Sequence, residues 1–392
     1  MNGYGPIGFL LDRNENFVST PYFFEEGIYP KMVEPIAETW VTIQVGYYDG
    51  LNAPGGYMPG IALWDEDGNR MGRYKGRTQI GLWGGDSRVM KIRHDDGRSR
   101  KPGYVLVAGG FDALCVAMVQ VSTHDFHAAL FGDTGYKCGQ SWYWSKTTAA
   151  GAGHRSRCVW LHGNAETDKN ARSLSFHIGD MVGARDKIDL YNRNSMYVCS
   201  CTRRFAYWSN MAPKGVPPFY KPPLLYNPDG QDPKREGADR EPDLAFDYER
   251  YDMDVWVEQG EPGNVSKIDE RDEEGDVGGG SSSGRNSTEK RRVGSRRRQG
   301  SNMNPDHLVV TEIAGQTATA ICEDANSQGF DIVSYIDNKF CDLSERKLYD
   351  ICTGKVTSNC FDADTYTIVA SINARGERSE VPKGYKTKDH WK

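Results

Sequence analysis

Hydrophobic and polar positions alternate with a period of two along much of residues 1–226. In residues 40–48, β-branched and aromatic side chains alternate as expected of a half-buried strand. Residues 59–64 and 70–74 flank Asp65–Asn69, whose Asp-Gly pair is typical of a hairpin turn. Short strands at this spacing predict a β-sandwich or jelly-roll-like domain.

Other patterns in the same region predict further elements. Residues 104–108 and 115–121 are the most apolar runs, so we expect them to be central strands. We expect 79–83 to pair with 89–93, 174–178 to form a strand, and 186–191 to form one or two helical turns. The four prolines of Pro217–Tyr226 predict an extended segment that lies against the domain and ends it.

Residues 227–304 have the composition of a linker. Gln231–Asp276 holds 17 acidic and 6 basic residues, a local charge of 6 − 17 = −11. Arg285–Arg298 holds 7 basic residues and 1 acidic residue, a local charge of +6. Charge blocks of this kind repel themselves and bury little apolar surface, so we expect a disordered tether, acidic and then basic.

Regular patterns return near residue 305. We expect 305–375 to be a small cystine-stabilised segment that packs back onto the first domain, and 376–392 to be a frayed tail. The elements expected in this segment are a helix at 318–325 and strands at 307–313, 331–335, 339–342 and 366–370.

Nine cysteines fall into two groups, five between Cys115 and Cys201 and four between Cys322 and Cys360. For the second group we favour Cys322–Cys341 and Cys352–Cys360, because short loops close most readily. In the first group, Cys138, Cys158 and either Cys199 or Cys201 are the better disulfide candidates. Cys115 lies in an apolar run and fits a buried thiol, so the pairing there stays open.

Composition limits the compartment and the partners. A net charge of −6 gives no general basic field, so nucleic-acid binding is not implied, and no run of 18 apolar residues could span a membrane. Met1–Leu11 lacks the features of a signal peptide. Clustered cysteines nevertheless favour an extracellular protein whose leader is missing from this gene model, over a cytosolic protein with reduced thiols.

Few residues suggest catalysis. Asp133, His177 and Asp180 are the candidates for a hydrolase that uses carboxylates. His124 and His127 have the spacing of metal ligands on one helix face, but they follow a strand, so polar loop residues are the better interpretation. No cofactor motif is present.

Aromatic residues concentrate near the first cysteines. Trp142, Tyr143, Trp144 and Trp160 would stack on a sugar or grip a partner if exposed, and would form core if buried; we favour core. Asn264 and Asn286 begin glycosylation sequons in the linker.

Six segments carry a resemblance to other proteins: Cys158–Leu161, Leu174–Asp180, Pro217–Tyr226, Gly329–Ser334, Lys339–Asp342 and Asn359–Asp362. In these segments the chain resembles a family of uncharacterised extracellular proteins of filamentous ascomycetes. This resemblance implies secretion and no particular activity; the chain departs from the family in lacking a leader and in its long charged linker.

The sequence therefore favours a secreted fungal glycoprotein with a non-catalytic role at the cell surface or host interface. A glycan or another protein is the expected partner. Two alternatives remain at this point: a glycan-directed hydrolase that uses carboxylates, and an accessory protein of a secondary-metabolite gene cluster.

Overall fold

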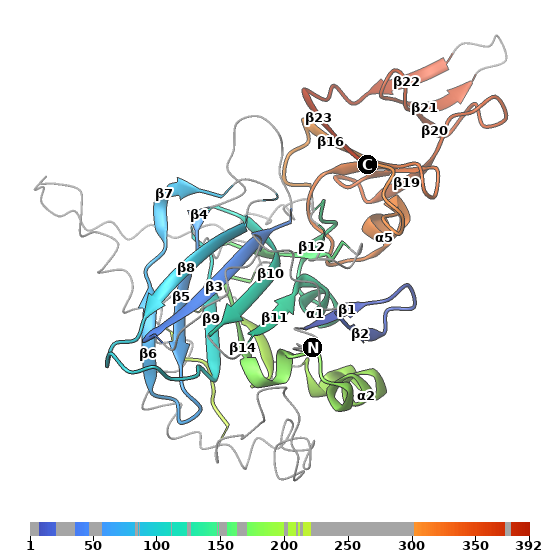
Figure 1. Ribbon diagram of the computed structural model, residues 1–392. Helices are drawn as coiled ribbons and strands as arrows, with labels where there is room; N and C mark the ends of the chain where they lie inside the picture. The colour runs from blue at the N-terminus through green and yellow to red at the C-terminus, as the bar shows by residue number, and fades with distance from the viewer. Residues whose placement is uncertain are drawn as a thin grey trace, which may run out of the picture.

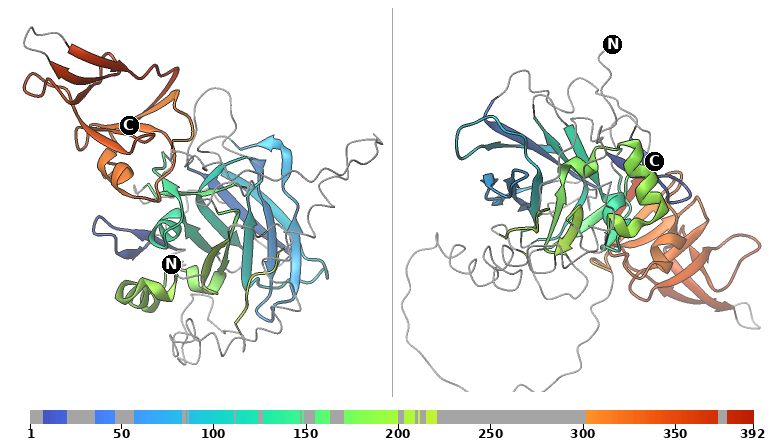
Figure 2. Two further views of the ribbon diagram at one scale, coloured as in Figure 1. Left: turned by 180° about the vertical axis from the view of Figure 1, so that it is seen from behind. Right: turned by 90° about the horizontal axis from the view of Figure 1, so that it is seen from below.

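The computed structural model describes residues 8–20, 36–46, 57–82, 85, 87–110, 112–123, 127–146, 148, 155–162, 171–199, 203–208, 211, 215–220, 302–372 and 378–392. These residues form a mainly β protein with an N-terminal sandwich and a C-terminal β unit beside it (Figures 1 and 2). Residues 227–301 of the expected linker, including Asn264 and Asn286, lie outside the described residues, as do His124 and Cys201. The expected linker boundary at 304 is wrong, because residues 302–304 belong to the C-terminal unit, where the Met303 N–H donates to the Gly329 carbonyl at 2.6 Å.

Two antiparallel sheets make the sandwich. The first has the order β12-β13-β10-β3-β8, with β11 also paired to β10. Its strands are β3 (Glu38–Val45), β8 (Ser87–Arg93), β10 (Leu114–Ser122), β11 (His127–Phe131), β12 (Trp142–Tyr143) and β13 (Cys158–Leu161). The second has the order β15-β14-β9-β5-β6. Its strands are β5 (Gly60–Trp64), β6 (Arg70–Tyr74), β9 (Tyr104–Ala108), β14 (Ser173–His177) and β15 (Phe205–Trp208).

Alternation along the strands decides which side chains enter the sandwich core. In β9, Val105 and Val107 join the main core, whereas Tyr104 and Leu106 face the other side of the sheet. Residues 217–220, the described part of the expected closing segment, cover that outer side. Phe219 and Tyr220 pack there, and the Tyr220 N–H donates to the Tyr104 hydroxyl at 2.9 Å.

The expected pairing of 79–83 with 89–93 is wrong. Strand β8 pairs with β3, whereas β7 (Arg77–Gly81) pairs with β4 (Tyr57–Met58). Both segments have the right local pattern for strands, but a period-two pattern does not specify the partner strand.

Short elements complete the N-terminal unit. The hairpin of β1 (Phe9–Leu11) and β2 (Phe17–Ser19) packs beside α1 (Gly132–Lys137) and α2 (Arg185–Arg193). Two 3₁₀ turns, Ile178–Met181 and Ser195–Tyr197, flank α2. Gly183 has φ +71°, and a Cβ there would collide with the backbone of Gly8, so this approach requires glycine.

An eight-stranded sheet with the order β22-β21-β20-β19-β18-β17-β16-β23 forms the C-terminal unit. The consecutive strands β22 and β23 lie at opposite edges. Only residues 383–386 connect them, a step of at most about 17 Å, so the sheet must roll up until its edges approach. The elements are β16 (His307–Thr311), α5 (Ala318–Glu323), β17 (Asp331–Ser334), β18 (Lys339–Asp342), β19 (Lys347–Ile351), β20 (Cys360–Asp362), β21 (Thr367–Ile372), β22 (Arg378–Pro382) and β23 (Thr387–Trp391).

The inside of this roll is an aromatic core. Phe340 stacks on Phe361 with ring centroids 3.8 Å apart, and Leu308, Val310 and Val333 surround them.

The expectation of a frayed tail at 376–392 is wrong. Residues 387–391 form β23, which pairs in parallel with β16, and the Trp391 side chain is fully buried.

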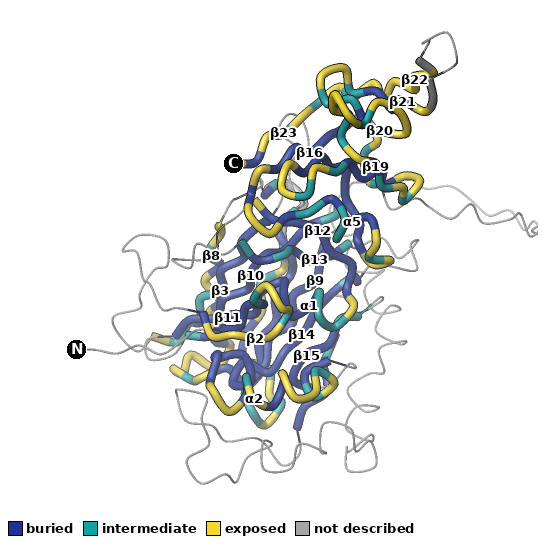
Figure 3. Tube along the Cα trace, turned by 90° about the vertical axis from the view of Figure 1, so that its right-hand side faces the viewer, coloured by how far each residue is buried: buried dark blue, intermediate teal, exposed yellow. Residues whose placement is uncertain are grey.

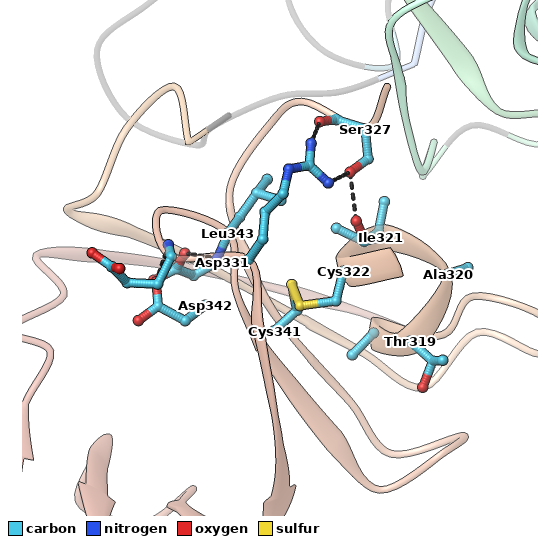
Figure 4. The surroundings of a disulfide bond; sticks show 12 residues. Thr319, Ala320, Ile321, Cys322, Ser327, Asp331, Cys341, Asp342 and Leu343 are labelled. Atoms are coloured by element: carbon cyan, nitrogen blue, oxygen red, sulfur yellow. Dashed lines mark hydrogen bonds between the residues drawn. A yellow bond between two sulfur atoms is a disulfide. The ribbon is translucent and has the colours of Figure 1, made fainter. Parts of the chain in front are cut away.

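Four disulfides lie within the two units, and no described cysteine connects one unit to the other. The expected Cys322–Cys341 and Cys352–Cys360 pairs are both present. Cys322 extends from α5 to Cys341 on β18, close to Ser327 and Asp331 (Figure 4). The interpretation of Cys115 as a buried thiol is wrong. It pairs with Cys158, and Cys138 pairs with Cys199.

Candidate functional site: a buried charge network and an aromatic interface

Two of the three catalytic candidates are brought together. His177 ends β14, and Asp180 lies in the 3₁₀ turn that follows, so the His177 ring Nδ1 meets the Asp180 Oδ2 at 2.7 Å. The other ring nitrogen, Nε2, contacts Glu66 Oε2 at 2.9 Å from the turn between β5 and β6. Asp180 and His177 are fully buried, whereas the Glu66 side chain keeps 29% of its surface exposed.

Two further cations complete the network. Lys187 Nζ of α2 lies 3.5 Å from Asp180 Oδ1, and Arg204 Nε, next to β15, lies 3.4 Å from the same oxygen. Both side chains are fully buried. We refer to Glu66, His177, Asp180, Lys187 and Arg204 as the charge network.

Electrostatics fix the protonation of this network. Burial disfavours the charged imidazolium, but the carboxylates of Glu66 and Asp180 outweigh it and raise the pKa of His177 to about 9. Burial likewise disfavours the Asp180 carboxylate, yet Arg204, Lys187 and His177 hold its pKa below the usual value. His177 is therefore protonated at neutral pH and cannot act as a general base there.

The raised pKa predicts a loss of stability in alkali. Because folding raises the pKa of His177 above 6.5, its contribution is complete below pH 6.5 and disappears as the pH rises to about 9. We expect the free energy of unfolding to fall by about 3 kcal/mol across this window, at 1.36 kcal/mol per pKa unit. Urea denaturation at several pH values measures the fall.

Two variants separate this effect from general alkaline instability. His177→Gln should flatten the profile between pH 6.5 and 9, whereas the exposed control His390→Gln should keep the slope of the parent protein. A parent profile that is already flat over this window would contradict the assignment.

Asp133, the third candidate, has a structural role in the first turn of α1. Its side chain is fully buried and accepts hydrogen bonds from the backbone N–H groups of Leu11 at 3.2 Å and Arg157 at 3.0 Å. The Arg157 guanidinium adds an ion pair at 3.3 Å. These contacts tie β1 and the residue before β13 to α1.

The four aromatic residues expected either to stack on a ligand or to form core are core. Trp142, Tyr143, Trp144 and Trp160 are between 0% and 5% exposed, so they offer no stacking surface. They lie where the sandwich meets the C-terminal unit, and the buried part of the chain continues across this junction (Figure 3). We call them the aromatic interface.

Each aromatic residue also donates a hydrogen bond across the junction. The donor and acceptor pairs are Trp142 Nε1 to Asp324 Oδ2 at 2.8 Å, Trp144 Nε1 to Thr317 O at 3.0 Å, Trp160 Nε1 to Gln328 O at 2.8 Å, and Tyr143 Oη to Phe330 O at 3.0 Å. Gly329 faces the Tyr143 ring so closely that any Cβ would overlap it. The two units thus share one specific core.

Sequence reasoning missed Glu66, Lys187 and Arg204. One signal was available for Lys187, which lies three and four residues before the buried Leu190 and Tyr191 and so falls on the apolar face of α2. Glu66 was assigned only to a hairpin turn, which the structure confirms between β5 and β6. Nothing in its spacing indicated His177, 111 residues away.

The structure also bears on metals and membranes. Within the described ranges, no group of three or more His, Cys, Asp or Glu residues is placed to hold a metal ion. His127 begins β11, whereas its expected companion His124 is outside those ranges. None of the helices in the described part of the chain has the length and apolar character needed to cross a membrane.

Comparisons with protein-family models, curated proteins and solved structures gave no match to this chain.

Proposed function

We propose that this is an extracellular binding protein whose partner is a glycan or another protein. The observation that carries the location is the set of four disulfides, two in each unit. Disulfides persist where the environment is oxidising, and small units gain the most from them. The resemblance to extracellular ascomycete proteins supports the same location.

The geometry of the expected catalytic residues favours binding over hydrolysis at those residues. Asp133, His177 and Asp180 are each fully buried. Asp133 is bonded to backbone N–H groups and Arg157, Asp180 to buried cations, and His177 to the carboxylates of Asp180 and Glu66. A dissolved substrate cannot reach them without unfolding of the surrounding elements. Their charges stabilise the junctions between strands and helices.

Thiol labelling of protein from its native host tests the location. We expect the eight cysteines of the four disulfides to resist an alkylating reagent in the denatured, unreduced protein and to react after reduction. Reaction of all nine cysteines without reductant would remove the case for export.

Glycan arrays and pull-downs with the disulfide-intact protein test the binding role. Saturable binding that is lost on thermal unfolding is the expected result. Signals that stay at background against both glycans and host surface proteins would count against the role.

A further inference from the structure

The edge strands of the two sheets meet at one side of the sandwich. Strand β6 closes the second sheet and β8 closes the first, and the two lie side by side (Figure 1). Just after β8, the Asp95 N–H donates to the Met71 carbonyl at 2.7 Å. Gly72 permits this approach, because a Cβ there would collide with the Arg93 carbonyl.

This side is strongly basic although the whole chain carries −6. Residues 70–101 hold 10 basic and 3 acidic side chains, a balance of +7. Subtracting the neighbouring Glu38, Asp65, Glu66 and Asp67 still leaves +3. We define the basic edge as its exposed members: Arg73, Lys75, Arg88, Lys91, Arg93, Arg98 and Lys101.

Two members of the basic edge lie in a row on β8. Lys91 and Arg93 are two residues apart on β8, so their side chains leave the same face about 7 Å apart. The Arg93 side chain is 88% exposed. Its ion pair with Glu38, at 3.5 Å, lies at the surface and is therefore weak.

An aromatic ring accompanies these cations. Lys91 Nζ lies 4.4 Å above the half-buried Trp40 ring, directly across from it on β3. On β6, Arg70 lies over Trp64, with 5.1 Å to the ring centroid. Rings that hold cations in place reduce the conformational entropy lost when a ligand binds.

Arg70 on β6 has a pKa below its ordinary value chiefly because it is partly buried; the positive charge of Arg73 lowers the pKa further, and the negative charge of Asp95 raises it.

We propose that the basic edge binds an acidic polysaccharide, a chain of sugars that bear carboxylate or sulfate groups. This names the ligand class for the binding role proposed above and rests on it. A linear polyanion can place its acidic groups on Lys91 and Arg93, which follow each other along one face of β8, while the Trp40 ring holds Lys91 in place. An extracellular location favours a polysaccharide over a nucleic acid.

Affinity chromatography of the full chain on immobilised heparin, polygalacturonate and single-stranded DNA tests the proposal. We expect retention on at least one polysaccharide at low ionic strength, released by salt. Retention must occur in the presence of the chain's own acidic run at 231–276, which carries −11. The proposal would be overturned if the chain were retained more strongly on DNA than on both polysaccharides. It would also be overturned if neither polysaccharide retained the chain.

Matched variants locate the site. Lys91→Gln/Arg93→Gln should weaken binding about tenfold or more and reduce the slope of log K against log salt by about 2. The control Lys347→Gln/Lys355→Gln removes the same charge from the exposed surface of the C-terminal unit, where Lys347 also lies over a ring, that of Tyr349, at 4.7 Å. The control should bind like the parent.

The outcomes also separate the two proposals. Equal weakening by both double variants would show nonspecific attraction and overturn the basic edge as a site. Background binding to the polyanions together with saturable binding to a neutral glycan or a protein would overturn the edge and retain the general binding role. Free thiols in the native protein would instead remove the extracellular location.

Discussion

Asp180→Asn is expected to lower the free energy of unfolding at neutral pH by about 3–5 kcal/mol. Asp180 is the carboxylate that faces both Lys187 and Arg204, and all three side chains are fully buried. Removal of one partner from a buried ionic group leaves uncompensated charge, at a cost of about 3–5 kcal/mol. Since a domain is stable by only about 5–15 kcal/mol in total, the loss should be visible as a lower urea midpoint.

Two comparisons make this prediction specific. Asp96→Asn removes an exposed carboxylate that pairs with Arg100 at 3.1 Å, and it should change the free energy of unfolding by less than about 1 kcal/mol. Asp180→Asn/Lys187→Met should be more stable than Asp180→Asn alone, because it removes a buried cation together with its anion. An Asp180→Asn protein as stable as the Asp96→Asn control would refute the role of the charge network.

Lys383→Met is expected to destabilise the C-terminal unit by about 3–5 kcal/mol. Lys383 lies in the connection between β22 and β23, and its Nζ bridges the carboxylates of Asp331 and Asp342, which are 1% and 5% exposed. Without the ammonium, two buried carboxylates face each other where the rolled sheet closes. Chemical denaturation of the full chain, followed by tryptophan fluorescence, measures the loss.

The pH dependence of this loss provides a second readout. Burial raises the pKa of Asp331 even with Lys383 present, and removing the cation should raise it further. A raised carboxylate pKa destabilises the folded state above that pKa, so the deficit of Lys383→Met should shrink on acidification. The control is Lys386→Met, four residues from β22, whose Lys386–Asp306 pair is 75% and 48% exposed; it should have little effect.

Local patterns predicted many of the elements but not their partners. The strand at 339–342 was predicted with its observed bounds, and the expected hairpin at Asp65–Asn69 is present. Local chain closure also predicted both C-terminal disulfides, whose cysteines are 19 and 8 residues apart. In the first group the separations are 43 and 61 residues, and there the pairing could not be derived.

The tail shows why one segment was mistaken. Thr387–Trp391 has four polar residues and one tryptophan, so its composition resembles that of a disordered tail. In the structure only the Trp391 side chain is buried. Its order comes from backbone hydrogen bonds to β16 and from burial of one indole at the junction of the two units. Composition alone predicts neither the pairing with β16 nor the burial of Trp391, because both depend on residues far away in the sequence.

The sequence by itself determined the β character of the chain, the turn at Asp65–Asn69 and the nearby cysteine pairs, because each depends on residues close along the chain. Only the tertiary structure decided that residues 66, 177, 180, 187 and 204 share one charge network, and that three tryptophans and a tyrosine join the two units. The physical reason is that burial and ion pairing depend on distances in space, which the order of residues does not specify until the strands have paired.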